Sequence, residues 1–347
     1  LVSIAKQQVD ELRGQGCDLV VCVGHIGNEQ ASGTLSRDLI EQVESIDLFI
    51  DAHDHQEVQE EVAGTLLVET GCYLHNIGVV VIDDGAPDSD LVAAGTFEGI
   101  DESVQVLIDE ENDRTNAELA VVLGSTPFFM DGNRAPGVRT QETNLGDFCA
   151  DAFRWTASFE LGREVDAGLI NGGGLRSSIE AGDISLGTLK TVMPFGNELV
   201  VVNVTGAQLL EALESACQGV GTGEPIGAFP QVSNISFEVN ATVPFEKGPV
   251  YPDSTYASPA APGARVTIFD VGGRGFSEDE TYSIATNSFI AEGGDTYHAF
   301  KDASDVEAPV TFGFDYEALT SYLVEGCDHA VPEQYAEPQG RIIVVID

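Results

Sequence analysis

Apolar residues in the first hundred positions follow two alternating patterns, a helical period and short runs that are almost continuously apolar. The helical period predicts amphipathic helices over 4–15 and around 36–45. The continuous runs predict strands, because apolar stretches of this length without alternation are typical of strands buried on both faces. These strands are expected in DLVVCVGH, IDLFIDAH, GTLLVETG and NIGVVVID, followed by a turn and one more short strand within 84–101.

The remaining pattern divides the chain into three predicted parts, 1–100, 101–123 and 124–347. Residues 101–123 indicate an acidic helix that is apolar on one side only, which we interpret as a connector between two domains. The third part mixes helical and strand patterns and predicts a mixed α/β domain. Its clearest elements are a helix in TNLGDFCADAFRWTAS, a strand and glycine-rich turn in VDAGLINGGGLRSS, a strand–turn–helix unit in NELVVVNVTGAQLLEALESAC, a proline-rich loop at 251–263 and a closing strand in RIIVVID.

The charge of the chain is strongly negative, because 58 acidic residues against 15 basic ones give a formal net charge of −43. Such a field repels nucleic-acid backbones and anionic membranes, which argues against polymeric nucleic acid as a partner. No apolar run approaches the roughly 20 residues that a membrane-spanning helix needs. An anionic substrate would require locally placed cations or metals, so the few arginines carry more information than usual.

Six cysteines occur without a CxxC pair or a zinc-finger spacing. Buried free thiols are expected for most of them. A disulfide between Cys217 and Cys327 stays open, and so do the redox compartment and the oligomeric state.

Three histidines follow predicted strands at the point where each strand ends. His25 closes the run VVCVGH, and His53 and His55 lie in DAHDHQ, directly after FIDA. Loops at the carboxyl ends of strands usually hold the chemistry of α/β sheets, and histidine is the commonest nitrogen ligand of zinc and similar metals. The three residues therefore predict a metal site, although they supply no carboxylate to bridge two metals.

These two motifs resemble the last two metal motifs of the calcineurin-like metallophosphatases, with Ala52 where glycine is usual. The resemblance implies that His25 and His53 bind one metal and His55 a second one. It also implies that residues 1–100 are the C-terminal part of a four-layer sandwich. The earlier motifs of that family, Asp-X-His, a bridging aspartate and Asn-His, are not in this sequence. We therefore interpret the chain as a fragment that lacks the catalytic residues, which are expected upstream.

The third part contains residue types suited to holding a nucleotide. A glycine turn lets backbone approach a ligand closely, an asparagine can pair with a base edge, and guanidinium groups grip phosphate. Aromatic rings beside turns can stack on a base, and a carboxylate after two glycines can accept hydrogen bonds from ribose. The candidate substrate-binding residues are Arg139, Asn171, Gly173, Arg176, Phe195, Phe289 and Asp295.

Five segments in order, ETNLGDFCADAFR, INGGGLRSSIEAGDIS, VMPFGNELVVVNVTGAQLLEALE, FPQVSNISF and YSIATNSFIAEGGDTY, resemble the C-terminal domain of the 5′-nucleotidase family. That family includes bacterial UDP-sugar hydrolases and animal ecto-5′-nucleotidases. The resemblance implies hydrolysis of nucleotide phosphates with two divalent metals (Zn, Mn or similar), with the nucleoside held by residues 124–347. It further implies rotation of the domains about the connecting helix, and an extracellular, periplasmic or cell-surface location.

Two other functions stay open on the sequence. A 2′,3′-cyclic nucleotide phosphodiesterase with 3′-nucleotidase activity shares most of these motifs. Alternatively, the chain binds a nucleoside or nucleotide without catalysis, an interpretation that the missing metal motifs favour. The preferred base and the position of the phosphate stay open as well.

Overall fold

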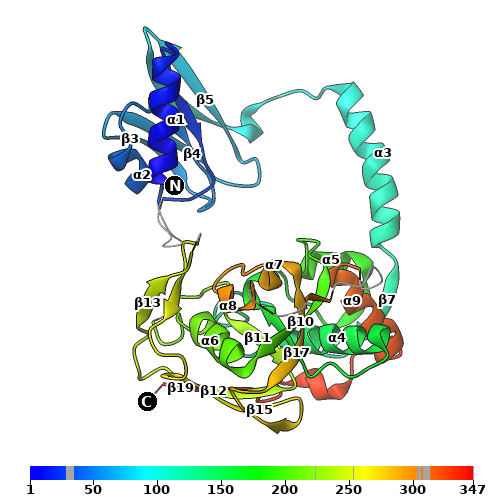
Figure 1. The fold of residues 1–347 in the computed structure, drawn as a ribbon. Helices are drawn as coiled ribbons and strands as arrows, with labels where there is room; N and C mark the ends of the chain where they lie inside the picture. The colour runs from blue at the N-terminus through cyan, green and yellow to red at the C-terminus, as the bar shows by residue number, and fades with distance from the viewer. Residues whose placement is uncertain are drawn as a thin grey trace. The chain divides into compact units, whose positions relative to one another are not determined.

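The computed structural model describes residues 1–28, 35–222, 224–252, 254–301, 303 and 313–346, with backbone alone at 306–307. The chain separates into two compact units, Leu1–Leu107 and Ile108–Asp347 (Figure 1). Buried apolar residues form one core in unit 1 and two in unit 2. The mixture of helices and mixed sheets is the α/β class expected from the sequence.

Unit 1 is built on a four-stranded sheet and a separate two-stranded hairpin. The sheet has the order β1-β2-β4-β3, in which β1, β2 and β4 are parallel and β3 is antiparallel to β4. The hairpin pairs β5 with β6. The elements are α1 (Val2–Gly14), β1 (Val21–Val23), α2 (Ser36–Gln42), β2 (Leu48–Ile50), β3 (Glu57–Val62), β4 (Thr65–Thr70), β5 (Asn76–Asp83), β6 (Ala86–Ala93) and η1 (Ala94–Thr96).

The helices of unit 1 cover one face of its sheet. Val9 of α1 and Leu39 of α2 pack in one core with Phe49 of β2. On β1, by contrast, Val21 is 42% exposed and Val23 is 75% exposed. The expectation that this strand is buried on both faces is wrong for the described residues. Successive side chains of a strand point to opposite faces, and along β1 only the face under α1 and α2 is covered.

The sequence pattern missed strand β3. Its sequence, EVQEEV, is mostly polar, but it pairs with β4 along its whole length, from Glu57 opposite Thr70 to Val62 opposite Thr65. Apolar character could not reveal it, because an edge strand can keep polar side chains in water while its backbone completes the sheet.

Helix α3 (Glu102–Leu119) runs across the boundary between the two units and contains no buried residue. The side chain of Asp101 accepts hydrogen bonds from the backbone N–H groups of Ser103 and Val104, at 3.0 and 3.3 Å. These bonds satisfy donors that the first turn of a helix leaves unpaired. The helix itself is confirmed, and its role as a connector stays a prediction.

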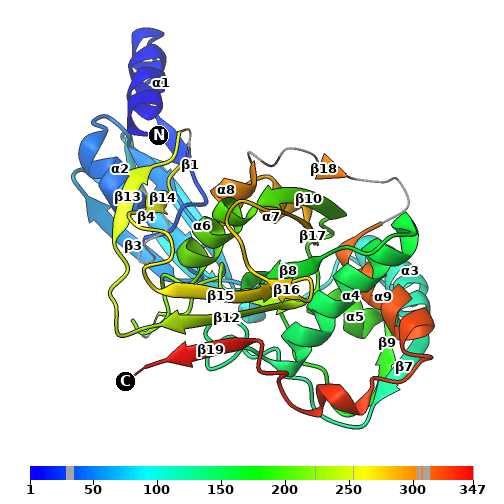
Figure 2. The ribbon, with the colours of Figure 1, turned by 60° about the horizontal axis from the view of Figure 1, so that its bottom comes forward.

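Unit 2 contains a five-stranded sheet of order β11-β8-β17-β10-β18 and a four-stranded sheet of order β16-β15-β12-β19 (Figure 2). Its helical segments are α4 (Asn144–Leu161), η2 (Gly172–Gly174), α5 (Leu186–Val192), α6 (Gly206–Ala216), α7 (Ser288–Ala291), α8 (His298–Lys301), α9 (Asp315–Ser321), η3 (Tyr322–Gly326) and η4 (Glu333–Ala336). Its strands are β7 (Val122–Thr126), β8 (Ala167–Asn171), β9 (Gly182–Ser185), β10 (Leu199–Thr205), β11 (Pro230–Ser233), β12 (Ile235–Asn240), β13 (Lys247–Val250), β14 (Ala257–Pro259), β15 (Val266–Val271), β16 (Arg274–Gly275), β17 (Thr281–Asn287), β18 (Val306–Glu307) and β19 (Ile342–Val345).

The five-stranded sheet of unit 2 is buried on both faces (Figure 1). Along β10, Val200 and Val202 belong to the core that includes residues of α6, whereas Leu199 and Val201 belong to the core that includes residues of α4. The continuously apolar run in β10 is therefore explained by two covered faces.

The segment 251–263, which we expected to be a loop, is in part a strand. Strands β13 and β14 form a two-stranded hairpin in which Val250 lies opposite Ala257. The backbone N–H of Tyr251 donates to the carbonyl of Tyr256 at 2.9 Å. Proline in the sequence argued against a strand, but an isolated ribbon has two free edges, where the missing N–H of proline costs nothing.

The described residues also show whether the cysteines are paired and whether a helix could span a membrane. All six cysteines are free thiols. Cys217 lies in one core of unit 2 and Cys327 packs against the other, so the two do not pair. Burial raises the pKa of Cys149 well above its usual value, which makes this thiol unreactive. No described helix combines the length and the apolar character that crossing a bilayer requires.

Candidate functional site

The candidate site lies at one end of the three central strands of the five-stranded sheet of unit 2, which are β8, β17 and β10. Strand β17 pairs in parallel with β8 and antiparallel with β10, where Asn287 lies opposite Leu199. The loops that follow β8 and β17 and the loop that precedes β10 therefore leave the sheet at the same end. These loops carry five of the predicted substrate-binding residues, namely Gly173, Arg176, Phe195, Phe289 and Asp295.

Asn171, the last residue of β8, holds Asp295 in place. Its Nδ2 donates to Oδ2 of Asp295 at 2.9 Å, and its Oδ1 accepts from Nδ2 of Asn287 at 3.4 Å. Asn171 is buried, so these bonds replace contacts with water. In this structure the amide orients a carboxylate, and its predicted contact with a base edge stays a prediction.

Asp295 offers an acceptor at the edge of the site. Its backbone is left-handed, with a φ of 50°. Burial raises the pKa of the carboxyl, while the hydrogen bond from Asn171 and the charge of Arg139 oppose that rise. Oδ2 is occupied by Asn171, and Oδ1 accepts no hydrogen bond from the described residues. The second oxygen is therefore available to a ligand.

The glycine turn after β8 is packed against backbone on two sides. The N–H of Gly173 donates to the carbonyl of Gly227 at 2.7 Å, and a Cβ on Gly173 would lie 2.9 Å from Cα of Gly227. A Cβ on Gly172 would lie 1.9 Å from the carbonyl oxygen of Val138. Only glycine fits these positions, and the close packing brings the turn beside Asp295.

Arg139 and Arg176 lie close enough to repel each other, and a third arginine joins them. Burial, followed by the charges of Arg134 and Arg176, lowers the pKa of Arg139 to about 10, while the charge of Asp295 opposes the shift. None of these three guanidinium groups forms an ion pair with a carboxylate among the described residues, whereas Arg274 and Arg341 do. The site thus concentrates positive charge in a very acidic chain.

Arg134 was not among the site residues predicted from the sequence. Its position five residues before Arg139, in a chain with few cations, was the only available signal. The loop that carries both arginines is held by Gln231, which is fully buried on β11. Gln231 Nε2 donates to the carbonyls of Val138 and Gln141, at 3.1 and 2.8 Å, and its Oε1 accepts from the N–H of Thr143 at 3.1 Å.

Two aromatic rings at this edge remain accessible. Phe195 is 58% exposed and Phe289 is 40% exposed. The guanidinium carbon of Arg176 lies 5.5 Å from the centroid of the Phe195 ring. The ring of Phe289 packs against Gly294, where a Cβ would approach it to 2.5 Å. Exposed rings held in this way can stack on a planar ligand.

The histidine motifs of unit 1 form only part of a donor set. The rings of His25 and His53 lie edge to face, with centroids 5.3 Å apart, whereas the ring of His55 lies 5.9 Å from that of Tyr73. The described residues include no group of three histidine, cysteine, aspartate or glutamate side chains that could hold a metal. The two imidazoles could occupy two coordination positions on one metal ion. The described residues do not supply the four ligands of the tetrahedral site that zinc prefers.

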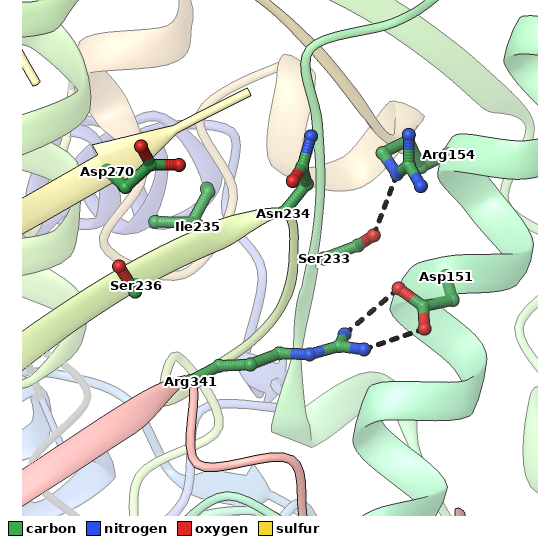
Figure 3. Close-up of a pocket in the computed structure, with 8 residues that line it drawn as sticks. All are labelled: Asp151, Arg154, Ser233, Asn234, Ile235, Ser236, Asp270 and Arg341. Carbon is green, nitrogen blue, oxygen red and sulfur yellow. Dashed lines mark hydrogen bonds and ion pairs between the residues drawn. The ribbon is translucent and has the colours of Figure 1, made fainter. Parts of the chain in front are cut away.

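A separate cavity of about 300 Å³ opens at the other end of the β8–β11 pair (Figure 3). Gly168 pairs with Ser233 there, three residues from Asn171, which is about 10 Å along a strand. Arg341 is engaged by Asp151 at 2.7 Å, and Nε of Arg154 donates to Ser233 at 3.0 Å. The cavity contains none of the predicted site residues and is explained by these structural contacts.

Comparison with known proteins links unit 2 to one family. Residues 122–302 match the model of the 5′-nucleotidase C-terminal domain, a range that contains every predicted substrate-binding residue. The trifunctional nucleotide phosphoesterase protein YfkN of Bacillus subtilis is 34% identical over 319 residues, covering 88% of this chain and 20% of YfkN. The cell wall protein Lmo0130 of Listeria monocytogenes is 27% identical over 355 residues, covering 90% of this chain and 41% of Lmo0130.

A crystal structure of a 5′-nucleotidase precursor from Thermus thermophilus has a similar fold. It superposes with a TM-score of 0.63 at 22% identity, covering 100% of this chain and 68% of that one. The chain spans only 20% and 41% of the lengths of the two curated relatives. Because residues 122–302, more than half of the chain, match the model of this domain, the chain belongs to the 5′-nucleotidase family.

Proposed function

We propose that this chain is the nucleotide-recognition part of a hydrolase that removes phosphate from nucleotides, a 5′-nucleotidase. The observation that carries the proposal is a group of three guanidiniums, none of which forms an ion pair with a described carboxylate, beside Asp295 and two exposed aromatic rings. In a chain with a net charge of −43, cations without carboxylate partners indicate an anionic ligand. An aromatic surface next to them suits the base of a nucleotide.

Each group has a distinct role in the proposal. Phe195 and Phe289 stack on the two faces of the base, and Oδ1 of Asp295 accepts a hydrogen bond from ribose. Arg134, Arg139 and Arg176 bind the phosphate. Their planar donors match phosphate oxygens, and burial of Arg139 strengthens its interaction with a charged ligand.

The two divalent metals (Zn, Mn or similar) rest on the resemblance to the metallophosphatases. In such sites metals polarise phosphoryl oxygens and activate water. His25, His53 and His55 would contribute ligands, and the remaining ligands would come from sequence outside this chain. Because the donor set is partial, we propose that this chain alone binds nucleotides without hydrolysing them.

A second candidate has the same site with a different ester as substrate. The name of the relative YfkN, a trifunctional nucleotide phosphoesterase, supports more than one kind of nucleotide ester. A 2′,3′-cyclic nucleotide phosphodiesterase with 3′-nucleotidase activity would use the same rings and arginines. The relative named as a cell wall protein supports a location at or outside the cell surface.

Calorimetric titration of the chain with adenosine and with AMP tests the recognition role. Phe289→Ala should weaken the affinity for both ligands about 5- to 150-fold, because a stacked base contributes roughly 1–3 kcal/mol. Phe269→Ala is the matched control, since this ring is exposed on β15 in the other sheet. Failure of the wild-type chain to bind any nucleoside or nucleotide would contradict the proposal.

Phosphate release tests the catalytic limit separately. With AMP and added Zn²⁺ or Mn²⁺, the chain should release no phosphate above the uncatalysed background. Turnover by the isolated chain would show that a complete metal centre forms within it, and that result would overturn the proposed division of labour.

A further inference from the structure

The two exposed rings of the candidate site lie on segments that meet where β17 ends and α7 begins, next to the start of β10 (Figure 2). Phe195 lies in the loop that precedes β10, three residues before Glu198. Phe289 lies on α7, directly after Ser288. A contact between Glu198 and Ser288 therefore joins the segments that carry the two rings.

The β10–β17 ladder continues for one more residue with the help of a side chain. Beyond the pair of Leu199 with Asn287, the N–H of Ser288 donates to the carbonyl of Glu198 at 2.8 Å. In an antiparallel sheet such a pair returns the bond, from the N–H of Glu198 to the carbonyl of Ser288. That carbonyl instead accepts from the N–H of Glu292 at 3.0 Å, because Ser288 begins helix α7. The N–H of Glu198 donates to Oγ of Ser288 at 3.1 Å, so the hydroxyl replaces the carbonyl of the ladder.

The ring of Phe289 is held by its own helix. The next two residues of α7, Ile290 and Ala291, are buried in a core of unit 2. The N–H of Ile290 donates to Oδ1 of Asn287 at 2.9 Å, which fixes the start of the helix. The ring also packs against Gly294. Phe289 therefore keeps its place independently of the loop that carries the other ring.

The ring of Phe195 depends on anchors at the end of an exposed loop. Residues 194–196 are all exposed. On one side, the N–H of Asp315 donates to the carbonyl of Asn197 at 2.8 Å, and its carboxylate accepts from Nδ2 of Asn197 at 3.4 Å. On the other side, Ser288 binds both backbone groups of the following residue. Ser288 is the anchor that connects this loop to the helix of the second ring.

We propose that Ser288 is a positioning residue, whose hydroxyl holds the loop of Phe195 at a fixed distance from the helix of Phe289 and so sets the gap that receives a planar base. The inference rests on the proposed function, since it assumes that the two rings enclose a base. A gap of about 0.5–1 Å already removes roughly a quarter to a half of the dispersion energy of a contact. A small shift of the loop therefore lowers affinity, although no atom that touches the ligand is removed.

The test is the affinity of the chain for adenosine and for AMP, measured by calorimetry. Ser288→Ala should weaken the affinity for both ligands by the same factor, about 2- to 10-fold, as expected for the loss of one neutral hydrogen bond. Ser288→Thr, which keeps a hydroxyl at this half-buried position, should bind both ligands as the wild type does. Ser258→Ala is the matched control, because it removes a hydroxyl that donates to a backbone carbonyl in the β13–β14 hairpin.

A double-mutant cycle with Phe195→Ala separates positioning of the ring from general support of the fold. AMP is the ligand for this cycle, because its phosphate keeps the proposed contacts with the arginines when one ring is removed. If Ser288 acts through the ring of Phe195, Ser288→Ala should cause no further loss of AMP affinity in the Phe195→Ala background.

The outcomes separate this inference from the proposed function. Unchanged affinity in Ser288→Ala overturns the inference and leaves the nucleotide site in place. An equal loss with and without the ring of Phe195 overturns it as well, because Ser288 would then support the fold of α7. A loss in Ser288→Thr as large as that in Ser288→Ala also overturns it, since the hydroxyl would not be the cause. Absence of wild-type binding to every nucleoside and nucleotide instead rejects the proposed function, and the inference with it.

Discussion

The sheets of the two units differ in how completely they are covered. In unit 2, strand β10 divides its side chains between two buried cores. In unit 1, strand β1 has an equally apolar run, yet Val21 and Val23 are exposed. An apolar run therefore predicts a strand, but it does not show whether both faces are buried. Burial depends on which helices and strands pack against each face.

The same contrast applies to the chemistry of the two units. In unit 2 the polar groups are oriented by protein contacts, as Asn171 orients Asp295. In unit 1 the rings of His25 and His53 meet without a third donor among the described residues. The groups of the proposed recognition site are therefore oriented by contacts within unit 2, whereas the proposed metal site has only two adjacent imidazoles among the described residues.

The largest expected effect tests whether the two units are independent. Phe153→Ala removes a fully buried ring of α4 and should lower the free energy of unfolding of unit 2 by about 3–5 kcal/mol. Hydrogen exchange followed by mass spectrometry should show lost protection in unit 2 and unchanged protection in β4 of unit 1. Phe49→Ala is the reciprocal variant, and loss of protection in both units from either change would show that they unfold together.

The next effect concerns the arginine group. Arg134→Ala should weaken the affinity for AMP about 10- to 150-fold, because a hydrogen bond to a charged group contributes roughly 1.5–3 kcal/mol. The affinity for adenosine, which lacks the phosphate, should fall by at most about twofold. Arg274→Ala is the control, since that guanidinium is already paired with Asp166 and Glu280. Equal losses for AMP and adenosine would show that Arg134 supports the fold of the site instead.

A smaller effect is expected from pH. Because burial raises the pKa of Asp295, this carboxyl gains a proton as the pH falls at values where an ordinary aspartate is still ionised. Adenosine affinity should therefore decline at a pH above the usual aspartate pKa of about 3.9, as the acceptor is lost. Asp295→Asn should abolish this dependence, and Asp270→Asn should keep it. An unchanged pH profile in Asp295→Asn would assign the titration to another group.

The smallest effect is expected from metal removal. EDTA should leave adenosine affinity within about twofold of its original value, since the rings and Asp295 act without metal. His53→Ala should weaken the binding of Zn²⁺ to the chain and leave adenosine binding unchanged. A loss of adenosine affinity in EDTA would remove the contrast between the two units, because it would place metal and nucleoside in one site.

Much of the fold was predictable from the apolar pattern of the sequence, even for β5, where most of the residues are exposed. The segment NIGVVVID predicted β5 to the residue, and the apolar spacing after Thr143 predicted α4. Strand β3 was not predictable from apolar character, since its polar side chains are those of an edge strand. The β13–β14 hairpin was missed because proline weighed against a strand that needs only one neighbour.

The site was predictable in its residue types but not in its contacts. Asn171 and Asp295 are separated by 124 residues, and nothing in either local segment indicates their hydrogen bond. Arg134 lies in a polar loop without periodicity, so only its electrostatic effect on Arg139 reveals its place.

The group of unpaired arginines has a consequence for the speed of binding. A nucleotide anion that approaches a chain of net charge −43 is repelled at long range, while in the proposed site Arg134, Arg139 and Arg176 attract it at short range. Salt shortens the reach of that repulsion, from about 8 Å at 0.15 M to about 3 Å at 1 M, but weakens close contacts much less. The association rate of AMP should therefore rise with ionic strength, the reverse of what anion sites on basic proteins show.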